Sequence, residues 1–347
     1  MPARPASLPV RLVRSALSLL ACQALVLVLQ GPALAQEMVV DDVFPQGFAF
    51  DDEPVTAYVN IDGIFWTRNM PGVPLMINSG TGQAIASTSK SLDFNVGSGP
   101  ALTVGGRFDD VLGIEASYFG FYDLHARGRF DLTAGNAATA DVPFPNLPAL
   151  TFTPGDYQTY EYKSDLTSVE LNMRADLTDR FNLLWGFRYL NLDENFRSTL
   201  YESTNAVFGS YGINARNNLF GFQIGGQRTF WLTDSWTLSL NGKVGVFGNA
   251  AEQTTSGTFL DGGTAPAERH ASDARASLVS QLGLQTAVQL SRHIAIRGGY
   301  QVFYANNVAL AASQITTSNW ATGGAGGIST NDELFAHGGN IGFEITW

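Results

Sequence analysis

The chain has 347 residues, 20 of them basic and 31 acidic, which gives a formal net charge of −11. Aromatic residues make up 12% of the sequence and charged residues 15%, a balance too apolar for a disordered protein. Without a basic block, nucleic-acid binding is excluded. Since no apolar run of about 18 residues occurs beyond the N-terminus, a polytopic helical membrane protein is excluded too.

The first residues are typical of a secretory signal peptide. A basic region, an apolar stretch and a small-residue cleavage motif follow one another: Arg4, Arg11 and Arg14, then residues 16–29, then Ala33-Leu34-Ala35. We expect cleavage after Ala35; a lipoprotein box ending at Cys22 is the less favoured interpretation. Cys22 is the only cysteine, so the mature chain would form neither disulfides nor thiolate metal sites.

An acidic segment, residues 36–54, comes next. Five of its six carboxylates lie close together in the sequence: Asp41, Asp42, Asp51, Asp52 and Glu53. We interpret it as a solvated, flexible periplasmic lead rather than a ligand site.

Further along the chain, apolar and polar residues alternate with a period of two. In the segment 165–176, Val169, Leu171 and Met173 alternate with Glu170, Asn172 and Arg174. On a strand these two sets point to opposite faces. The same alternation recurs in the segments 112–118, 181–189, 236–246, 275–285 and 294–304. The strands that contain these segments are expected to be about 11–17 residues long, near or above the length that a tilted strand needs to cross a bilayer.

The connections between these segments alternate in length. Short turns are predicted at residues 109–110, 177–180, 232–235 and 291–292, and long polar connections at 69–90, 126–164, 193–216, 249–273 and 306–334. This asymmetry is typical of bacterial outer-membrane barrels. About ten strands are predicted, with both termini on the periplasmic side.

A soluble β-sandwich would also show alternation. We disfavour it because soluble strands average about five or six residues. Aromatic residues also lie beside the short turns, as an interfacial girdle requires: Phe108, Phe181, Phe230, Trp236 and Trp347.

The last strand ends the chain on an aromatic residue. Ile341, Phe343, Ile345 and Trp347 share one face of it. This pattern resembles the C-terminal signal that the barrel assembly machinery reads, so that machinery is an expected partner during biogenesis.

Some segments resemble a known family. Residues 184–194 (LWGFRYLNLDE) and 217–225 (NNLFGFQIG) carry most of the resemblance, and residues 102–108, 113–119 and 243–245 add to it. They are similar to strands of the planctomycete-type outer-membrane β-barrel family and of the related Legionella-type pore-forming outer-membrane proteins. The resemblance implies an outer-membrane barrel and transfers no catalytic residues.

Ten charged residues fall on the face predicted to line the lumen: Arg107, Glu115, Glu170, Arg174, Arg188, Arg228, Lys243, Arg275, Arg297 and Glu344. Isolated charges are costly in a narrow lumen, so they should pair across strands or stay hydrated. We favour a network of ion pairs and Gln/Asn side chains that plugs the barrel. A narrow, water-filled pore whose arginine-rich wall favours small anions is the alternative.

The connection 126–164 contains four prolines among apolar residues: Pro143, Pro145, Pro148 and Pro154, with Phe144, Leu147, Leu150 and Phe152. Such a stiff, apolar insertion either folds inward as a constriction, packs over the barrel mouth, or forms a surface loop of limited freedom. The surface loop is the favoured interpretation.

Catalytic motifs are weak. His125 and His270 lack the Asp-x-His spacing, and His293 belongs to a short turn. His270-Ala271-Ser272 has the His-x-Ser spacing of outer-membrane phospholipases, but it falls in a predicted loop rather than on a strand. We therefore predict no enzyme, no cofactor and no metal site, with a phospholipase as the remote alternative.

The sequence predicts an all-β, transmembrane, antiparallel up-and-down barrel over residues 55–347, behind a signal peptide at 1–35. The expected location is the outer membrane of a Gram-negative-type cell, where lipid surrounds the barrel. The expected role is envelope structure or porin-like passage of small solutes. A surface interaction or adhesion protein that uses long extracellular loops is the alternative.

Overall fold

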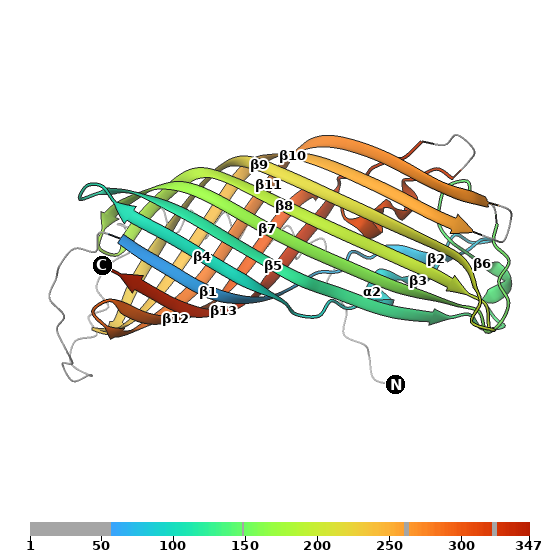
Figure 1. The fold of residues 1–347 in the computed structure, drawn as a ribbon, viewed down its shortest axis with the longest axis horizontal. Helices are drawn as coiled ribbons and strands as arrows, with labels where there is room; N and C mark the ends of the chain where they lie inside the picture. The colour runs from blue at the N-terminus through green and yellow to red at the C-terminus, as the bar shows by residue number, and fades with distance from the viewer. Residues whose placement is uncertain (1–56, 148, 260–263, 321–324) are drawn as a thin grey trace, which may run out of the picture.

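Ten strands pair edge to edge into a closed antiparallel barrel, in the order β1-β13-β12-β11-β10-β9-β8-β7-β5-β4 (Figure 1). The computed structural model describes residues 57–147, 149–259, 264–320 and 325–347. The predicted signal peptide and the acidic segment 36–54 lie outside the described residues. The strands are β1 (Ala57–Arg68), β4 (Gly97–Arg107), β5 (Leu112–Asp131), β7 (Tyr157–Thr178), β8 (Phe181–Tyr201), β9 (Val207–Thr233), β10 (Trp236–Phe259), β11 (Thr264–Ser291), β12 (Ile294–Val308) and β13 (Asp332–Thr346). The predicted fold class and the strand number are confirmed.

The first and last strands close the barrel. Ala57 and Trp347 exchange two backbone hydrogen bonds, with N···O distances of 2.9 and 3.1 Å, and the pairing of β1 with β13 continues to Arg68. The ring therefore has no free edge, as a strand structure in lipid requires. The start of β1 and the end of β13 lie at the same rim as the short turns, which is the periplasmic rim of such barrels.

The turn between β4 and β5 shows how tight these connections are. The backbone N–H groups of Val111 and Leu112 donate to Asp109 Oδ1 at 2.8 and 2.5 Å. These hydrogen bonds stabilise the carboxylate and lower the pKa of Asp109. An Asp at this position accepts hydrogen bonds from the backbone N–H groups of its own turn.

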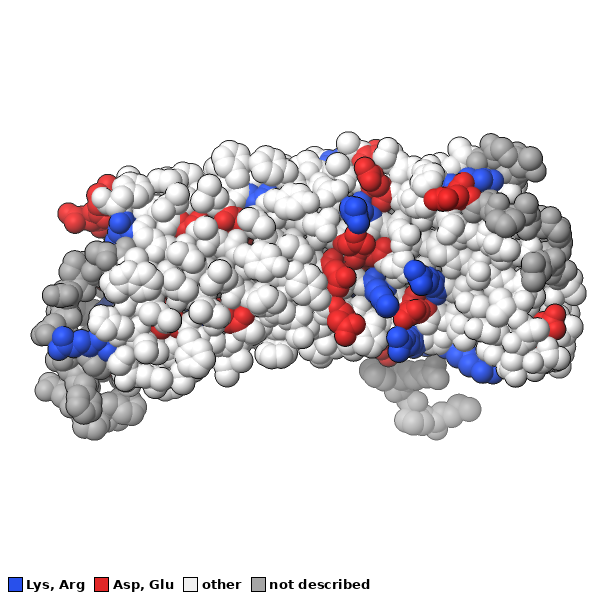
Figure 2. All heavy atoms as spheres, in the orientation of Figure 1, with Lys and Arg blue, Asp and Glu red and all other residues white. Residues whose placement is uncertain are grey.

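Apolar side chains on the outer surface form a continuous lipid-facing band. Exposed members come from strands all around the barrel: Phe65, Val104, Ile114, Leu171, Phe187, Phe222, Val246, Leu284, Ile296 and Phe343. On the face that Figure 2 shows, this band is the mostly white stretch left of centre, and a strip of charged residues follows it toward the outer end. Aromatic residues lie at both of its borders, as at membrane interfaces.

Two girdle contacts illustrate these borders. At the outer border the Tyr189 hydroxyl donates to Asn218 Oδ1 at 2.7 Å. At the periplasmic border the Trp236 indole N–H donates to Thr286 Oγ1 at 2.6 Å. Both rings thus keep an apolar body toward lipid and a polar atom in a hydrogen bond.

The strands continue far beyond the outer border, where the sequence pattern predicted loops. The predicted loops at 193–216 and 249–273 are wrong, because β8 extends to Tyr201, β9 begins at Val207, β10 extends to Phe259 and β11 begins at Thr264. These strands form arms beyond the lipid-facing band, and Figure 1 shows them running toward β2, β3 and β6.

The polarity of the two faces reverses along these arms. In β8, Phe196 and Leu200 point inward and are fully buried, whereas Arg197 on the opposite face is exposed. Outside the membrane the outer wall meets water and the inside meets other protein, so the apolar residues change face. The rule that apolar residues face outward and polar residues face inward therefore assigns the wrong faces there.

Short elements fill the outer end of the barrel. A small sheet has the order β3-β2-β6, and its strands are β2 (Pro74–Asn78), β3 (Ala84–Ser87) and β6 (Ala140–Asp141). The helices are α2 (Thr88–Ser91), η1 (Ala137–Thr139) and η3 (Ala311–Thr316). Leu75 and Met76 of β2 are fully buried in a core that also takes in the arms. We call this assembly the cap.

None of the described helices has the length and apolar character needed to cross a membrane.

Candidate functional site

Eight of the ten charged residues predicted to line the lumen border its inner cavities or lie buried inside it: Arg107, Glu115, Glu170, Arg174, Arg188, Lys243, Arg297 and Glu344. The other two, Arg228 and Arg275, lie elsewhere, as described below. The lumen holds three layers along its axis: a polar vestibule at the periplasmic rim, a buried ion cluster and an apolar seal.

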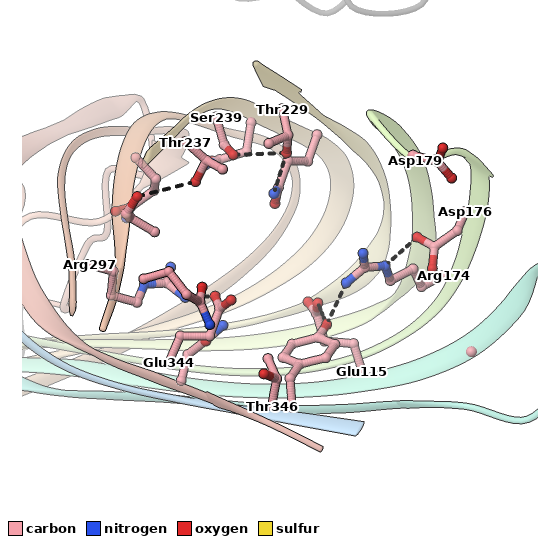
Figure 3. Close-up of a pocket in the computed structure, with 18 of the residues that line it drawn as sticks. Glu115, Arg174, Asp176, Asp179, Thr229, Thr237, Ser239, Arg297, Glu344 and Thr346 are labelled. Atoms are coloured by element: carbon pink, nitrogen blue, oxygen red, sulfur yellow. Dashed lines mark hydrogen bonds and ion pairs between the residues drawn. The ribbon is translucent and has the colours of Figure 1, made fainter. Parts of the chain in front are cut away.

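The vestibule is a cavity of about 340 Å³ at the periplasmic end (Figure 3). On one side the Tyr58 hydroxyl donates to Glu115 Oε2 at 2.5 Å and accepts from Arg174 Nη1 at 3.0 Å. Asp176 then accepts from both Arg174 Nε and Arg107 Nε at 2.7 Å. Two guanidinium groups and two carboxylates thus share one continuous network with the Tyr58 hydroxyl.

A second charged group lies across the vestibule. The Arg297 guanidinium contacts Asp62 Oδ1 at 3.3 Å and Glu344 Oε2 at 3.5 Å. Figure 3 shows Arg297 and Glu344 on one side and Arg174 on the other, with the hydroxyls of Thr229 and Ser239 between them. The vestibule wall therefore carries both signs of charge, and most of its charges are paired with neighbours rather than directed at the cavity.

The Tyr58 ring occupies space that a neighbouring glycine leaves open. Gly105 is its register partner on β4, and a Cβ on Gly105 would overlap the Tyr58 ring. A larger residue at this position would displace the tyrosine from the network.

Deeper in the lumen, Glu170 is the centre of a buried ion cluster. It accepts from Lys243 Nζ and Gln223 Nε2 at 2.7 Å and from Asn172 Nδ2 at 3.1 Å, and Arg188 Nε lies 3.3 Å away. Glu170 and Arg188 are almost completely buried. This cluster is the ion-pair and Gln/Asn network that the favoured interpretation described.

Arg188 joins the ion cluster to the apolar seal. Its guanidinium carbon lies 5.4 Å from the ring centroids of both Phe119 and Phe303, while Nε donates to Ser168 Oγ at 2.9 Å. The cation therefore faces a carboxylate on one side and aromatic faces on the other, a favourable setting for arginine.

The apolar seal fills the middle of the lumen. Trp66 packs on Phe119, Phe121 and Phe303, with ring centroids 5.5, 5.4 and 6.5 Å apart. Nine strands contribute buried members: Trp66, Phe119, Leu166, Leu190, Leu219, Phe247, Val279, Phe303 and Leu334. The tenth, β4, contributes Ala101, which packs against them. The seal therefore spans the whole circumference.

A second closure lies above the seal. We call residues 309–320, which contain η3, the inward loop. Asn217 on β9 holds its start by donating to the Ala309 carbonyl at 2.8 Å and accepting from Ala309 N at 2.7 Å. Ala311, Ala312 and Ile315 are fully buried, so the loop runs inside the barrel.

Glu194 ties the inward loop to the wall. It accepts hydrogen bonds from Ala311 N at 2.8 Å, Tyr162 OH at 2.6 Å and Ser164 Oγ at 3.1 Å. It also forms an ion pair with Arg68, and both side chains are completely buried. Neither charge was predicted, because Glu194 fell in the predicted connection 193–216 and Arg68 in none of the alternating segments.

The proline-rich connection covers the mouth. Phe144, Leu150 and Phe152 are buried, and the Phe144 ring lies 4.9 Å from Tyr211 and 5.1 Å from Trp320. The favoured surface loop is wrong here, because aromatic residues of the arms offer these side chains a core that the sequence pattern did not reveal.

Arg228 requires a correction. Its register partners are Phe181 and Leu240, which face lipid, and its guanidinium lies 5.6 Å from the Phe230 ring. Gln227 and Thr229 line the vestibule instead. An arginine at the membrane border can extend its charged end to the headgroups, so its presence did not mark the inner face.

Arg275 lies at the outer end rather than in the inner lumen. It pairs with Asp273 at 3.0 Å, contacts Asn331 at 2.6 Å and is 47% exposed. Its register partner Asn249 lies two residues beyond Phe247 of the seal.

His270 and Ser272 lie on β11 rather than in a loop. The imidazole Nδ1 of His270 lies 2.9 Å from Thr254 Oγ1 and its Nε2 lies 3.2 Å from Glu268 Oε1. Both ring nitrogens are therefore engaged by residues other than Ser272. Among the described residues, no group of three or more His, Cys, Asp or Glu side chains is arranged to hold a metal ion.

The residues of the predicted C-terminal signal face outward. Ile341, Phe343, Ile345 and Trp347 are 36–60% exposed and belong to the lipid-facing band. Recognition of this face by the assembly machinery remains a prediction.

We expect Tyr58→Phe to lower the free energy of unfolding by about 1–3 kcal/mol, because Glu115 and Arg174 each lose a partner in a partly buried site. The shift of the urea unfolding midpoint measures the effect. Tyr189→Phe, which removes an exposed hydroxyl at the outer girdle, is the matched control and should shift the midpoint less. Equal midpoints for the two variants would contradict the role of the network.

A family model described as "Putative beta barrel porin-7 (BBP7)" matches residues 94–347. Among solved structures, the chain is similar to the outer membrane protease OmpT from Escherichia coli, at 9% identity and a TM-score of 0.45, covering 87% of this chain and 99% of that one. It is also similar to the translocator domain of the autotransporter NalP from Neisseria meningitidis, at 11% identity and a TM-score of 0.38, covering 96% and 98%. For the toluene transporter TodX from P. putida the identity is 9% and the TM-score 0.33, covering 85% and 91%. A comparison with curated proteins finds no match.

Proposed function

Because the chain belongs to the beta barrel porin-7 family and is an integral outer-membrane β-barrel, we propose that it serves the envelope as a closed barrel with a rigid cap. In this conformation it conducts no solutes. Its proposed role is structural: the barrel is embedded in lipid and holds the folded cap above the membrane.

The apolar seal is the observation that carries this proposal. A water-filled passage needs a continuous polar path, and a hydrophobic constriction expels water. Trp66 is 1% exposed and Phe303 is completely buried, and this tight packing supports a lumen that is closed to water. The inward loop, held by Glu194, adds a second barrier in series.

Gated passage of small polar solutes is the second candidate. The vestibule supports it, since about 340 Å³ of polar space opens toward the periplasm, and the family name refers to porins. Passage would require both the seal and the inward loop to move. Surface interaction through free loops has less support, because Phe144 and Phe152 of the longest predicted loop are buried in the cap.

We also propose that the barrel is not an enzyme. His270 is exposed and its ring nitrogens contact Thr254 and Glu268, and inside the lumen Glu170 and Glu194 are each held in a network of hydrogen bonds and ion pairs. We infer that the phospholipase alternative does not apply, and an assay of the purified barrel on phospholipid liposomes tests this.

Planar-bilayer recording tests the closed state. We expect the refolded wild-type barrel to give no steady channel openings under a moderate applied voltage, while an open trimeric porin in the same bilayer does. Faster migration of the unboiled protein on SDS gels confirms that the silent barrel is folded. Steady openings from the folded wild-type protein would overturn the proposal and favour the porin-like role.

A further inference from the structure

A hydrophilic groove runs along the outer wall of the arms, above the lipid-facing band. Two adjoining hollows of about 620 and 540 Å³ form it, and they share Arg197 and Thr199. It lies on the outside of the barrel and belongs neither to the vestibule nor to the seal.

Two rows of side chains line the groove across neighbouring strands. The first row alternates in charge on three strands, because Arg127 pairs in register with Glu161 and Glu161 with Arg197. The second row carries only hydroxyls: Thr159, Thr199, Ser210 and Thr258. At the Arg127 end the groove thus offers cationic groups beside a line of hydroxyls, while Glu268 places an exposed carboxylate at its far end.

The charge at the Arg127 end is positive. Arg127 is 69% exposed and Lys163 is 56% exposed, and both contact the single carboxylate of Glu161, at 3.0 and 3.7 Å. Arg197 is exposed as well. Three cations around one carboxylate leave an excess of positive charge directed outward, and an arginine fork suits a phosphate group.

The position of the groove narrows the choice of partner. On the lipid side it is bordered by carboxylates in adjacent strands, namely Asp123, Asp165 and Asp193; the N–H of Asp123 donates to Asp165 at 3.0 Å, and Asp165 is the register partner of Asp193. These groups repel phosphates at the membrane border. The cations lie farther out along the same strands: Arg127 is four residues beyond Asp123 in β5, and Arg197 is four residues beyond Asp193 in β8.

We propose that this groove binds the phosphorylated sugars of the glycolipid in the surrounding outer leaflet. The sugars extend above the acyl chains to the height of the groove, where Arg127, Lys163 and Arg197 meet phosphate and the hydroxyl row meets sugar hydroxyls. Basic pockets of membrane proteins recognise anionic lipid headgroups in this way. The inference concerns the outer wall and is independent of whether the lumen is closed.

A glycine allows the groove to be filled without disturbing the wall. Gly212 is the register partner of Arg197, and a Cβ placed there would meet Ser256 Oγ at 3.8 Å and Arg197 Cγ at 3.9 Å. These are ordinary contacts, so Gly212→Thr occupies the groove and keeps its charges.

The test titrates the folded full-length barrel, in detergent, with a glycolipid that carries phosphorylated core sugars, and counts bound lipid by native mass spectrometry. We expect the double variant Arg127→Gln/Arg197→Gln to bind about tenfold more weakly or worse, because charge-assisted hydrogen bonds to phosphate are lost. Gly212→Thr should also weaken binding. Lipid A without core sugars should bind the wild-type barrel more weakly than the complete glycolipid.

Arg216→Gln is the matched control. Arg216 lies on the same outer wall, is 59% exposed and pairs with Asp193 at 2.6 Å, but it does not line either hollow. Its variant should bind like wild type. An equal loss in Arg216→Gln, full binding by the groove variants, or equal binding of lipid A would each overturn the proposal, and gel migration of unboiled samples shows that every variant is folded.

Discussion

We expect Glu194→Ala to lower the free energy of unfolding by about 3–5 kcal/mol, because it leaves the buried Arg68 cation without its counter-charge. The same change removes the acceptor of Tyr162, Ser164 and Ala311 N, so the inward loop loses its attachment to β8. Urea unfolding of the folded barrel in detergent, followed by tryptophan fluorescence, measures the loss.

Two comparisons isolate the cause. Glu252→Ala removes an exposed carboxylate from β10 and should change the stability by no more than about 0.5 kcal/mol. Arg68→Met placed in a Glu194→Met background should be more stable than Glu194→Met alone, since no buried charge then remains unpaired. If adding Arg68→Met made the barrel less stable, the ion pair would not be the dominant interaction.

The second large effect concerns conduction. We expect Trp66→Ala combined with Glu194→Ala to produce steady channel openings in planar bilayers, while each single variant stays silent. The seal and the inward loop close the lumen in series, so opening one leaves the other in place. Trp66→Ala should also cost about 3–5 kcal/mol of stability, as expected for truncating a buried aromatic side chain.

Phe65→Ala is the control for the seal. Phe65 neighbours Trp66 on β1 but faces lipid and is 50% exposed, so its truncation combined with Glu194→Ala should leave the barrel silent. Openings from Glu194→Ala alone would show that the aromatic seal is no barrier. A folded but silent Trp66→Ala/Glu194→Ala variant would show that the cap closes the lumen without either element.

The sequence predicted the membrane-spanning part of the barrel well because one rule applies there. Lipid outside and a polar lumen inside fix the parity of every strand, so the alternation alone places Glu170, Arg174 and Lys243 on the inner face. The prediction that Arg228 lines the lumen was wrong because an arginine at the membrane border reaches the headgroups with its flexible side chain. The alternation of residues along the strand does not place such a charge.

The arms and the seal could not be predicted in the same way. Along β8 the side chains that point into the lumen change from Arg188 to Leu190 and Leu192. The expected contrast between an apolar outer face and a polar inner face is therefore lost there. The partners of these leucines come from distant strands and from the inward loop. Tertiary packing of this kind leaves no periodic signal along the chain.

The reversal of polarity along the arms also sets an order for biogenesis. Placing charged residues such as Arg127 and Arg197 of the outer wall in the hydrocarbon costs free energy. We therefore expect the arms to cross the membrane before pairing with the adjacent strands fixes their position. The core around Leu75 and Phe144 assembles only once that chain has arrived on the cell surface. Insertion and maturation of the cap are thus separate stages, and a barrel with a defective cap would reach the membrane yet stay susceptible to external protease.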